Sequence, residues 1–146
     1  MFRRTLTIGL ALAAGVALAV GAASTDLTSK GAKPRRIAAG QEVKITDYLV
    51  PGKITVFDFT SEFCPPCRAI APALEKMHGK RADIAVVAVD INRPDVKGID
   101  WKSPVARQYN LNSIPHFKVF GPDGKLMAED GPDDAKARSM IVKWLD

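Results

Sequence analysis

Both cysteines of the chain lie in the four-residue stretch Cys64 to Cys67, which reads CPPC. A pair with this spacing can form a structural disulfide, hold part of a metal site or exchange electrons with a substrate. A disulfide that closes so short a loop constrains the unfolded chain little, so a purely structural role explains the pair poorly. A zinc site needs about four ligands. The chain adds only two histidines, His78 and His116, at no characteristic spacing, so the pattern favours redox chemistry.

The residues around the pair predict where it lies in the fold. The β-branched and aromatic run from Ile54 to Phe59 predicts a strand buried on both faces. A helix is expected to begin at the cysteines and to end near His78. Unpaired N–H groups and the helix dipole favour an anion at a helix N-terminus, so a thiol there ionises more readily. We therefore expect Cys64, at the more exposed end, to attack a disulfide, and Cys67, almost one turn deeper, to resolve the mixed disulfide.

The remaining elements predict an α/β domain. Short apolar runs predict further strands at Val43–Ile45, Ile84–Asp90, Phe117–Phe120 and Lys125–Ala128. A short helix to Tyr109 is expected after Ser103 as N-cap and Pro104 as first residue, and a last helix from Asp133 or Asp134 to Leu145. A parallel strand–helix–strand unit followed by a hairpin implies a mixed central sheet with helices on both faces.

The N-terminal residues are typical of an exported protein. Arg3 and Arg4 precede an apolar run that ends in small residues, which is the layout of a secretory signal peptide. The run from Leu6 to Ala23 is also nearly long enough to span a bilayer, so an uncleaved anchor is the alternative. We expect a signal peptide at 1–23, a flexible basic linker at 24–40 and a folded domain at 41–146. Export would place the domain in the periplasm or another extracytoplasmic compartment, where disulfides persist.

Composition excludes some classes of function. Hydrophobic residues make up 47% of the chain and charged residues 25%, which is ordinary for a globular domain. The net charge is +5, and no stretch combines aromatic residues with dense lysine and arginine, so nucleic-acid binding is not indicated. A chain of 146 residues can bury a core without needing a disulfide to fold.

Three motifs together resemble the thioredoxin superfamily over about residues 41–146. The segment from Val56 to Pro72, VFDFTSEFCPPCRAIAP, is similar to its active-site segment, and Asn112 to Pro115 is similar to its cis-proline loop. Gly131 matches a glycine before the last helix. The resemblance implies a thioredoxin fold and a redox-active disulfide between the two cysteines.

The resemblance also implies a substrate-binding surface. Pro115 would follow a cis peptide bond, with its loop against the disulfide, and the backbone of Ile114 would pair with a substrate strand. His116, next along the chain, either tunes the thiolate or lies as a partly exposed ring beside the groove. The expected substrate-binding residues are Phe63, Pro65, Pro66, Ile114, Pro115 and His116.

Asp58 is the third expected catalytic residue. An acid in the middle of a buried strand is costly, and desolvation should raise its pKa. Such an acid beneath Cys67 can accept the thiol proton when Cys67 attacks the mixed disulfide. Ala88 stands where thioredoxins often have a lysine facing this acid, so we expect the pKa of Asp58 to rise further.

Two departures from the family pattern bear on function. Pro65 and Pro66 remove two N–H donors that could face the Cys64 thiolate, so we expect a rather reducing couple. The loop from Asn92 to Lys102 is longer than in thioredoxin, and its Trp101 could contact a partner or cover the sheet edge.

The sequence thus predicts an exported thiol–disulfide oxidoreductase that reduces disulfides in extracytoplasmic proteins. No metal and no dissociable cofactor is expected, because the dithiol carries the electrons. The expected partners are protein disulfide or dithiol substrates and a membrane electron carrier, and the protein is expected to be a monomer. The alternatives are a copper metallochaperone or site-assembly factor using Cys64, Cys67 and His116, a disulfide-forming oxidant, and a non-catalytic binding module, against which the intact cysteine pair argues.

Overall fold

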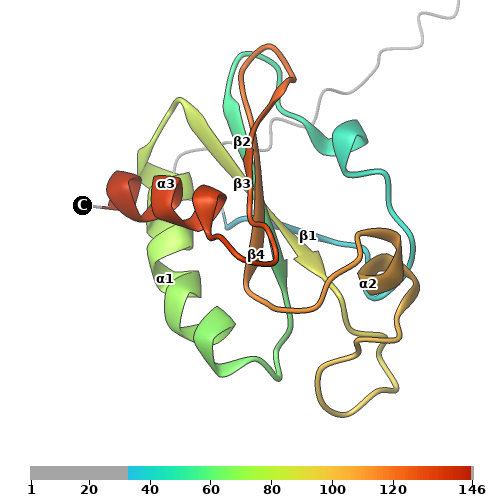
Figure 1. Ribbon diagram of the computed structural model, residues 1–146. Coiled ribbons are helices and arrows are strands. Elements are labelled where there is room, and N and C mark those ends of the chain that lie inside the picture. Colours follow the sequence, from blue (N-terminus) through green and yellow to red (C-terminus); the bar gives the residue numbers. More distant parts are fainter. Residues whose placement is uncertain (1–32, 146) are drawn as a thin grey trace, which may run out of the picture.

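A five-stranded mixed sheet forms the centre of the molecule in the computed structural model, which describes residues 33–145 (Figure 1). The strands are β1 (Arg35–Ile37), β2 (Ile54–Thr60), β3 (Ile84–Asp90), β4 (His116–Phe120) and β5 (Leu126–Glu129). Their order across the sheet is β1-β3-β2-β4-β5. The first three strands are parallel, whereas β4 runs antiparallel to β2 and β5 antiparallel to β4. The predicted α/β class and mixed sheet are confirmed.

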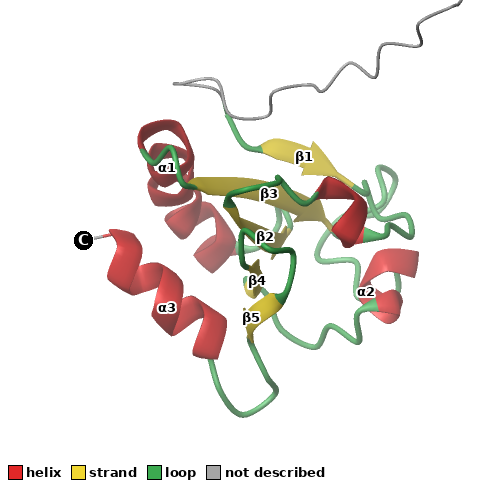
Figure 2. Cartoon of the chain, turned by 90° about the horizontal axis from the view of Figure 1, so that it is seen from above, coloured by secondary structure: helices red, strands yellow, loops and turns green. Residues whose placement is uncertain are grey.

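Helices cover both faces of the sheet (Figure 2). Helices α1 (Pro65–Lys80) and α3 (Lys136–Leu145) lie on one face, and α2 (Pro104–Gln108) lies on the other. Each face has its own apolar cluster, because alternate residues of β2 point to opposite sides. Val56 packs in the cluster with Leu74 of α1 and Ile141 of α3. Phe57 and Phe59 pack in the other cluster, which includes residues of α2.

Strand β2 connects this core to the cysteines. It lies between β3 and β4, and every residue after Ile54 is buried. It ends four residues before Cys64, so the core of the sheet fixes where α1 begins. The observed bounds of β2, α1 and β3 lie within two residues of the predicted ones. Ser103 caps α2 as expected, since its side chain accepts a hydrogen bond from the Ala106 N–H at 3.2 Å.

Two sequence predictions are wrong at the start of the domain. Residues 35–37 were expected to be flexible linker, but they form β1, whose backbone pairs with β3 although only Ile37 is buried. Val43–Ile45 is not a strand, and Ile45–Tyr48 forms a 3-10 helix, η1. The Tyr109 hydroxyl donates to the Val43 carbonyl at 2.7 Å and accepts from the Ile45 N–H at 3.2 Å. These backbone groups would hydrogen-bond to a neighbouring strand if the segment were a strand.

The expected signal peptide or anchor at 1–23, and the linker up to residue 32, lie outside the described residues. Within residues 33–145, none of the helices has the length and apolar character needed to cross a membrane.

Candidate active site around the cysteine pair

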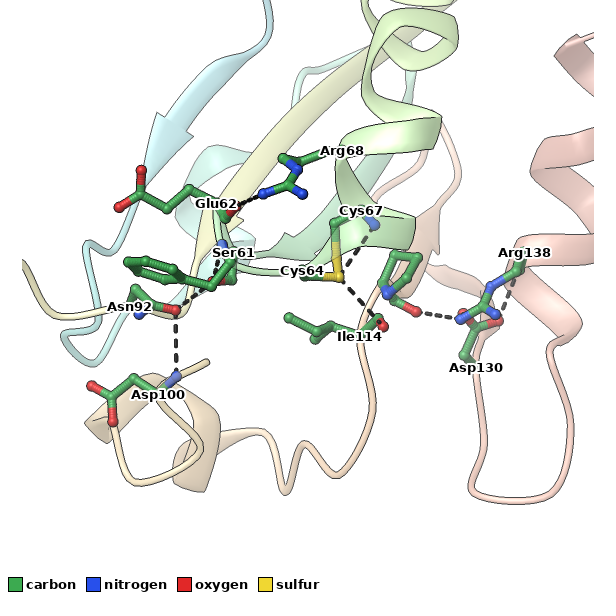
Figure 3. The surroundings of a disulfide bond; sticks show 12 residues. Ser61, Glu62, Cys64, Cys67, Arg68, Asn92, Asp100, Ile114, Asp130 and Arg138 are labelled. Carbon is green, nitrogen blue, oxygen red and sulfur yellow. Dashed lines mark hydrogen bonds and ion pairs between the residues drawn. A yellow bond between two sulfur atoms is a disulfide. The ribbon is translucent and has the colours of Figure 1, made fainter. Parts of the chain in front are cut away.

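The two cysteines form a disulfide at the N-terminus of α1 (Figure 3). Cys64 is the N-cap residue, and the two prolines that follow occupy the first helical positions, as predicted. The Cys67 N–H donates to Cys64 Sγ at 3.2 Å. Both cysteines are 1% exposed. The expectation that Cys64 is the more exposed of the two is therefore wrong for the disulfide form.

The cis-proline loop lies against the disulfide. The Ile114–Pro115 peptide bond is cis, as expected. The Ile114 carbonyl oxygen lies 3.7 Å from Cys64 Sγ, so this loop covers the sulfur that was expected to be accessible. Once the pair is reduced, the Cys64 thiol can donate to this carbonyl.

An ion pair between α3 and the preceding turn holds the cis-proline loop in place. The Arg138 guanidinium donates to the Pro115 carbonyl and lies 3.8 Å from the Asp130 carboxylate. The Asp130 carboxylate in turn accepts from the Phe117 N–H at 3.1 Å and from the Arg138 N–H at 2.9 Å. Sequence reasoning missed this clamp, because nothing near Asp130 or Arg138 indicates that they meet the loop.

The long loop of residues 92–102 braces the other side of the disulfide, as Figure 3 shows. The Ser61 hydroxyl donates to Asn92 Oδ1 at 2.6 Å and accepts from the Phe63 N–H at 3.1 Å. Arg93 and Asp100 close the loop through hydrogen bonds of 2.7 and 3.0 Å, and the bonded guanidinium lowers the pKa of Asp100. The loop thereby fixes the backbone that enters the active site.

The residues expected to bind substrate differ in their exposure to solvent. Phe63 and Ile114 are half-buried, and Pro65 and Pro66 are exposed, so the four form an accessible apolar rim around the buried disulfide. Pro115 is buried beneath them. Trp101, on the long loop, is 40% exposed.

The His116 side chain lies on the face of the sheet opposite α1. It pairs with Phe59 in the β2–β4 register, so it faces the α2 side of the sheet, and the two rings are 5.6 Å apart. Burial lowers its pKa, and its Nε2 lies 3.7 Å from Glu129 Oε1 beside a separate hollow of about 640 Å³. The contacts of His116 are therefore with Phe59 and Glu129, and its expected part in substrate binding stays a prediction.

Residues 33–145 contain no group of three or more histidine, cysteine, aspartate or glutamate side chains placed to hold a metal ion. His78 accepts a hydrogen bond from the Val86 N–H at 3.0 Å. The copper alternative thus lacks a third ligand among these residues.

Asp58 is buried in β2 beneath the helix that carries the cysteines. It is 4% exposed, and its Oδ1 atom has no hydrogen-bond partner. Burial raises its pKa from 3.8 to about 7, while the positive charges of Arg36 and Arg138 oppose the rise. The raised pKa is as expected. Ala88 supplies no charge to Asp58, but Arg36 on β1, which pairs with Ala88, supplies a positive charge that sequence reasoning did not identify.

A cavity of about 230 Å³ adjoins Asp58. Ala71 of α1 also lines it. Cys67 lies four residues before Ala71, and residues with this spacing share one face of a helix. A cavity of this size has room for water. Asp58 and Ala71 thus line one cavity, and Cys67 lies one helical turn before Ala71 on the same side of α1.

Comparison with known proteins gives a single family. The sequence profile described as Thioredoxin matches residues 41–146. The chain is 27% identical to chloroplastic thioredoxin F of Oryza sativa subsp. japonica over 135 residues, covering 87% of this chain and 68% of that protein. It is 32% identical to a Brassica campestris H-type thioredoxin over 91 residues, covering 62% of this chain and 68% of that protein.

Solved structures share the fold. The crystal structure of spinach chloroplast thioredoxin F (short form) superposes with a TM-score of 0.53 at 20% identity, covering 80% of this chain and 94% of that one. Thioredoxin f2, solved in complex with ferredoxin:thioredoxin reductase, gives a TM-score of 0.53 at 21% identity and covers 79% and 94%. The chain therefore belongs to the thioredoxin family, and it is a thiol–disulfide oxidoreductase with a CxxC-spaced cysteine pair.

Proposed function

We propose that this protein reduces disulfides in extracytoplasmic proteins. The observation that carries the reducing direction is the set of donors around Cys64. Prolines at the first two helical positions have no N–H, and the Cys67 N–H is the backbone donor that reaches Cys64 Sγ. Because few hydrogen-bond donors reach it, the Cys64 thiolate is only weakly stabilised. A couple whose reduced form is weakly stabilised is a reductant rather than an oxidant.

The site supports a two-step exchange. A substrate strand lies on the apolar rim and pairs with the backbone of Ile114. The Cys64 thiolate attacks the substrate disulfide, and one substrate sulfur leaves as a thiolate. Cys67 then gives its proton to Asp58 and attacks Cys64 Sγ, so the second substrate sulfur leaves. The protein ends as the disulfide that the structure contains.

The N-terminal sequence supports export. Arg3 and Arg4, the apolar run and the small residues before Ser24 are the pattern of a signal peptide. The exported domain works as a monomer and receives its electrons from a membrane carrier. Thioredoxin f2 has been solved in complex with ferredoxin:thioredoxin reductase, and we infer that this protein docks its electron donor at the disulfide.

Disulfide reduction by the domain of residues 33–146 tests the activity. With dithiothreitol as electron source, the domain should accelerate the reduction of insulin disulfides, and Cys64→Ser should abolish the acceleration. Cys67→Ser should instead accumulate a mixed disulfide with the substrate, visible by mass spectrometry. Acceleration that survives Cys64→Ser would contradict the proposed chemistry.

Expression of the full chain in a bacterium with a periplasm tests export. Release of the protein by osmotic shock, with an intact mass that corresponds to cleavage after Ala22 or Ala23, is the expected result. A full-length protein in the cytoplasmic fraction would contradict export.

A further inference from the structure

A positively charged residue, Arg36, lies two strands away from Asp58. Arg36 on β1 pairs with Ala88 on β3, and Ala88 pairs with Asp58 on β2. Residues paired directly across neighbouring strands point to the same face of a sheet. Arg36 and Asp58 are thus separated by two strand spacings, or about 10 Å between backbones, and the side chain between them is only a methyl group.

Arg36 is held on this face by a second carboxylate. Its Nε donates to Asp90 Oδ2 at 3.0 Å. Asp90 lies two residues after Ala88 on β3, so its side chain points to the same face. Arg36, Ala88 and Asp58 all line the cavity of about 230 Å³ described above. The small side chain of Ala88 therefore leaves the space between the guanidinium and the buried carboxylate open.

The other charged groups that face Asp58 come from each neighbouring element. Lys33 precedes β1 and lines the same cavity, and Glu75 lines it from α1. Arg138 approaches from α3, but it is shared with Asp130 and the Pro115 carbonyl. Of the two arginines, Arg36 opposes the rise in the pKa of Asp58 more strongly.

We propose that Arg36, held by Asp90 across Ala88, is a positioning residue that favours the ionised form of Asp58, the form that accepts a proton from Cys67. The inference rests on the proposed function, because it assigns Arg36 to the resolving step. In that step the Cys67 S–H proton goes to the Asp58 carboxylate, a Cys67–Cys64 bond forms, and the Cys64–substrate bond breaks. The pair of electrons of the broken bond leaves with the substrate sulfur, which takes a proton from water.

The kinetic test follows the two thiolates that reduced protein releases from 5,5′-dithiobis(2-nitrobenzoate). With the protein in excess, attack by Cys64 releases the first and resolution by Cys67 releases the second. In Arg36→Gln, the pH midpoint of the second phase should move to higher pH by about half a unit or more, as expected for loss of a nearby opposite charge. The first phase reports Cys64 and should keep its midpoint.

The same strand provides a matched control. Arg35 is the neighbouring arginine, but it lies over the Tyr48 ring at 4.8 Å, on the opposite face. Arg35→Gln removes the same charge and should leave the second phase unchanged. Two further variants keep or restore a positive charge among the paired positions 36, 88 and 58. They are Arg36→Lys and the double variant Arg36→Gln with Ala88→Lys, and both should return the midpoint of the second phase toward that of the wild type.

A second measurement does not depend on turnover. The Asp58 carboxyl can be titrated by carbon-13 NMR in the disulfide form, where Arg36→Gln should raise its midpoint and Arg35→Gln should not. Should Arg36→Gln fail to fold, Ala88→Lys alone adds a cation and should lower the midpoint. Equal shifts in the two glutamine variants, or none in either, would overturn the role of Arg36. Wild-type protein that releases no second thiolate would instead overturn the proposed function, and the NMR titration would still decide on Arg36.

Discussion

Asp58 should make the oxidised protein less stable as the pH rises, and Asp58→Asn should remove this loss. The carboxyl is buried, and its pKa is about 7 in the folded protein against 3.8 for the free side chain. Between these two values the folded state holds a proton that the unfolded state has released. The contribution of Asp58 to stability is therefore fully present below pH 3.8 and is lost as the pH rises to about 7.

The magnitude follows from the two pKa values. One pKa unit corresponds to about 1.4 kcal/mol, so the interval from 3.8 to about 7 corresponds to about 4 kcal/mol at pH 8 and above. An asparagine has nearly the same shape, stays neutral at every pH and leaves a similar buried polar group. Asp58→Asn should thus match the wild type near pH 4 and exceed its stability by about 4 kcal/mol at pH 8.

Urea unfolding of the two proteins in their disulfide form, at pH 4, 6 and 8, measures this difference. The free energies of unfolding should separate progressively with pH. Ser61→Ala is a suitable comparison, because it disrupts a buried hydrogen bond near the same site without removing a titrating group. Parallel pH profiles for the wild type and Asp58→Asn would refute the claim that Asp58 is buried with a raised pKa.

Three further predictions concern the elements around the disulfide. Arg138→Met removes the donor to the Pro115 carbonyl and should destabilise the protein by about 1–3 kcal/mol in urea unfolding. The rate of insulin reduction should also fall. An unchanged rate would show that Arg138 does not position the cis-proline loop. Pro66→His restores a backbone N–H and adds a polar ring beside Cys64, so the reduction potential should rise by about 30 mV or more, measured in a glutathione buffer; a lower potential would contradict the role given to the prolines. Ser103→Ala removes the N-cap of α2 and should cost about 1 kcal/mol without changing the reduction potential.

The elements that could be predicted from sequence carry strong local patterns. The apolar runs of β2 and β3, the prolines at the start of α1, and Ser103 with Pro104 each determine their own structure through propensity or capping. Strand β1 could not be predicted, because its three residues carry two exposed arginines and form a strand only by pairing with β3.

Some residues of the candidate site could likewise be predicted from local sequence patterns, and others could not. Cys64, Cys67 and Asp58 could be identified from the sequence, because two cysteines in a short motif and an acid inside a buried strand are unusual on their own. Arg36 and the clamp formed by Arg138 could not, since their roles depend on contacts between residues far apart in the chain. His116 shows how strand alternation limits inference from sequence neighbours: it follows Pro115 directly, but its side chain points to the face of the sheet opposite α1.

The reduction potential of the Cys64–Cys67 couple is the most direct test of the central claim. Equilibration of the domain with defined ratios of reduced and oxidised dithiothreitol, followed by thiol alkylation, gives the value. A potential near about −270 mV is the predicted result, because the proline pair leaves the Cys64 thiolate with few donors. A potential between about −120 and −180 mV would contradict the reducing role and identify an oxidant or isomerase.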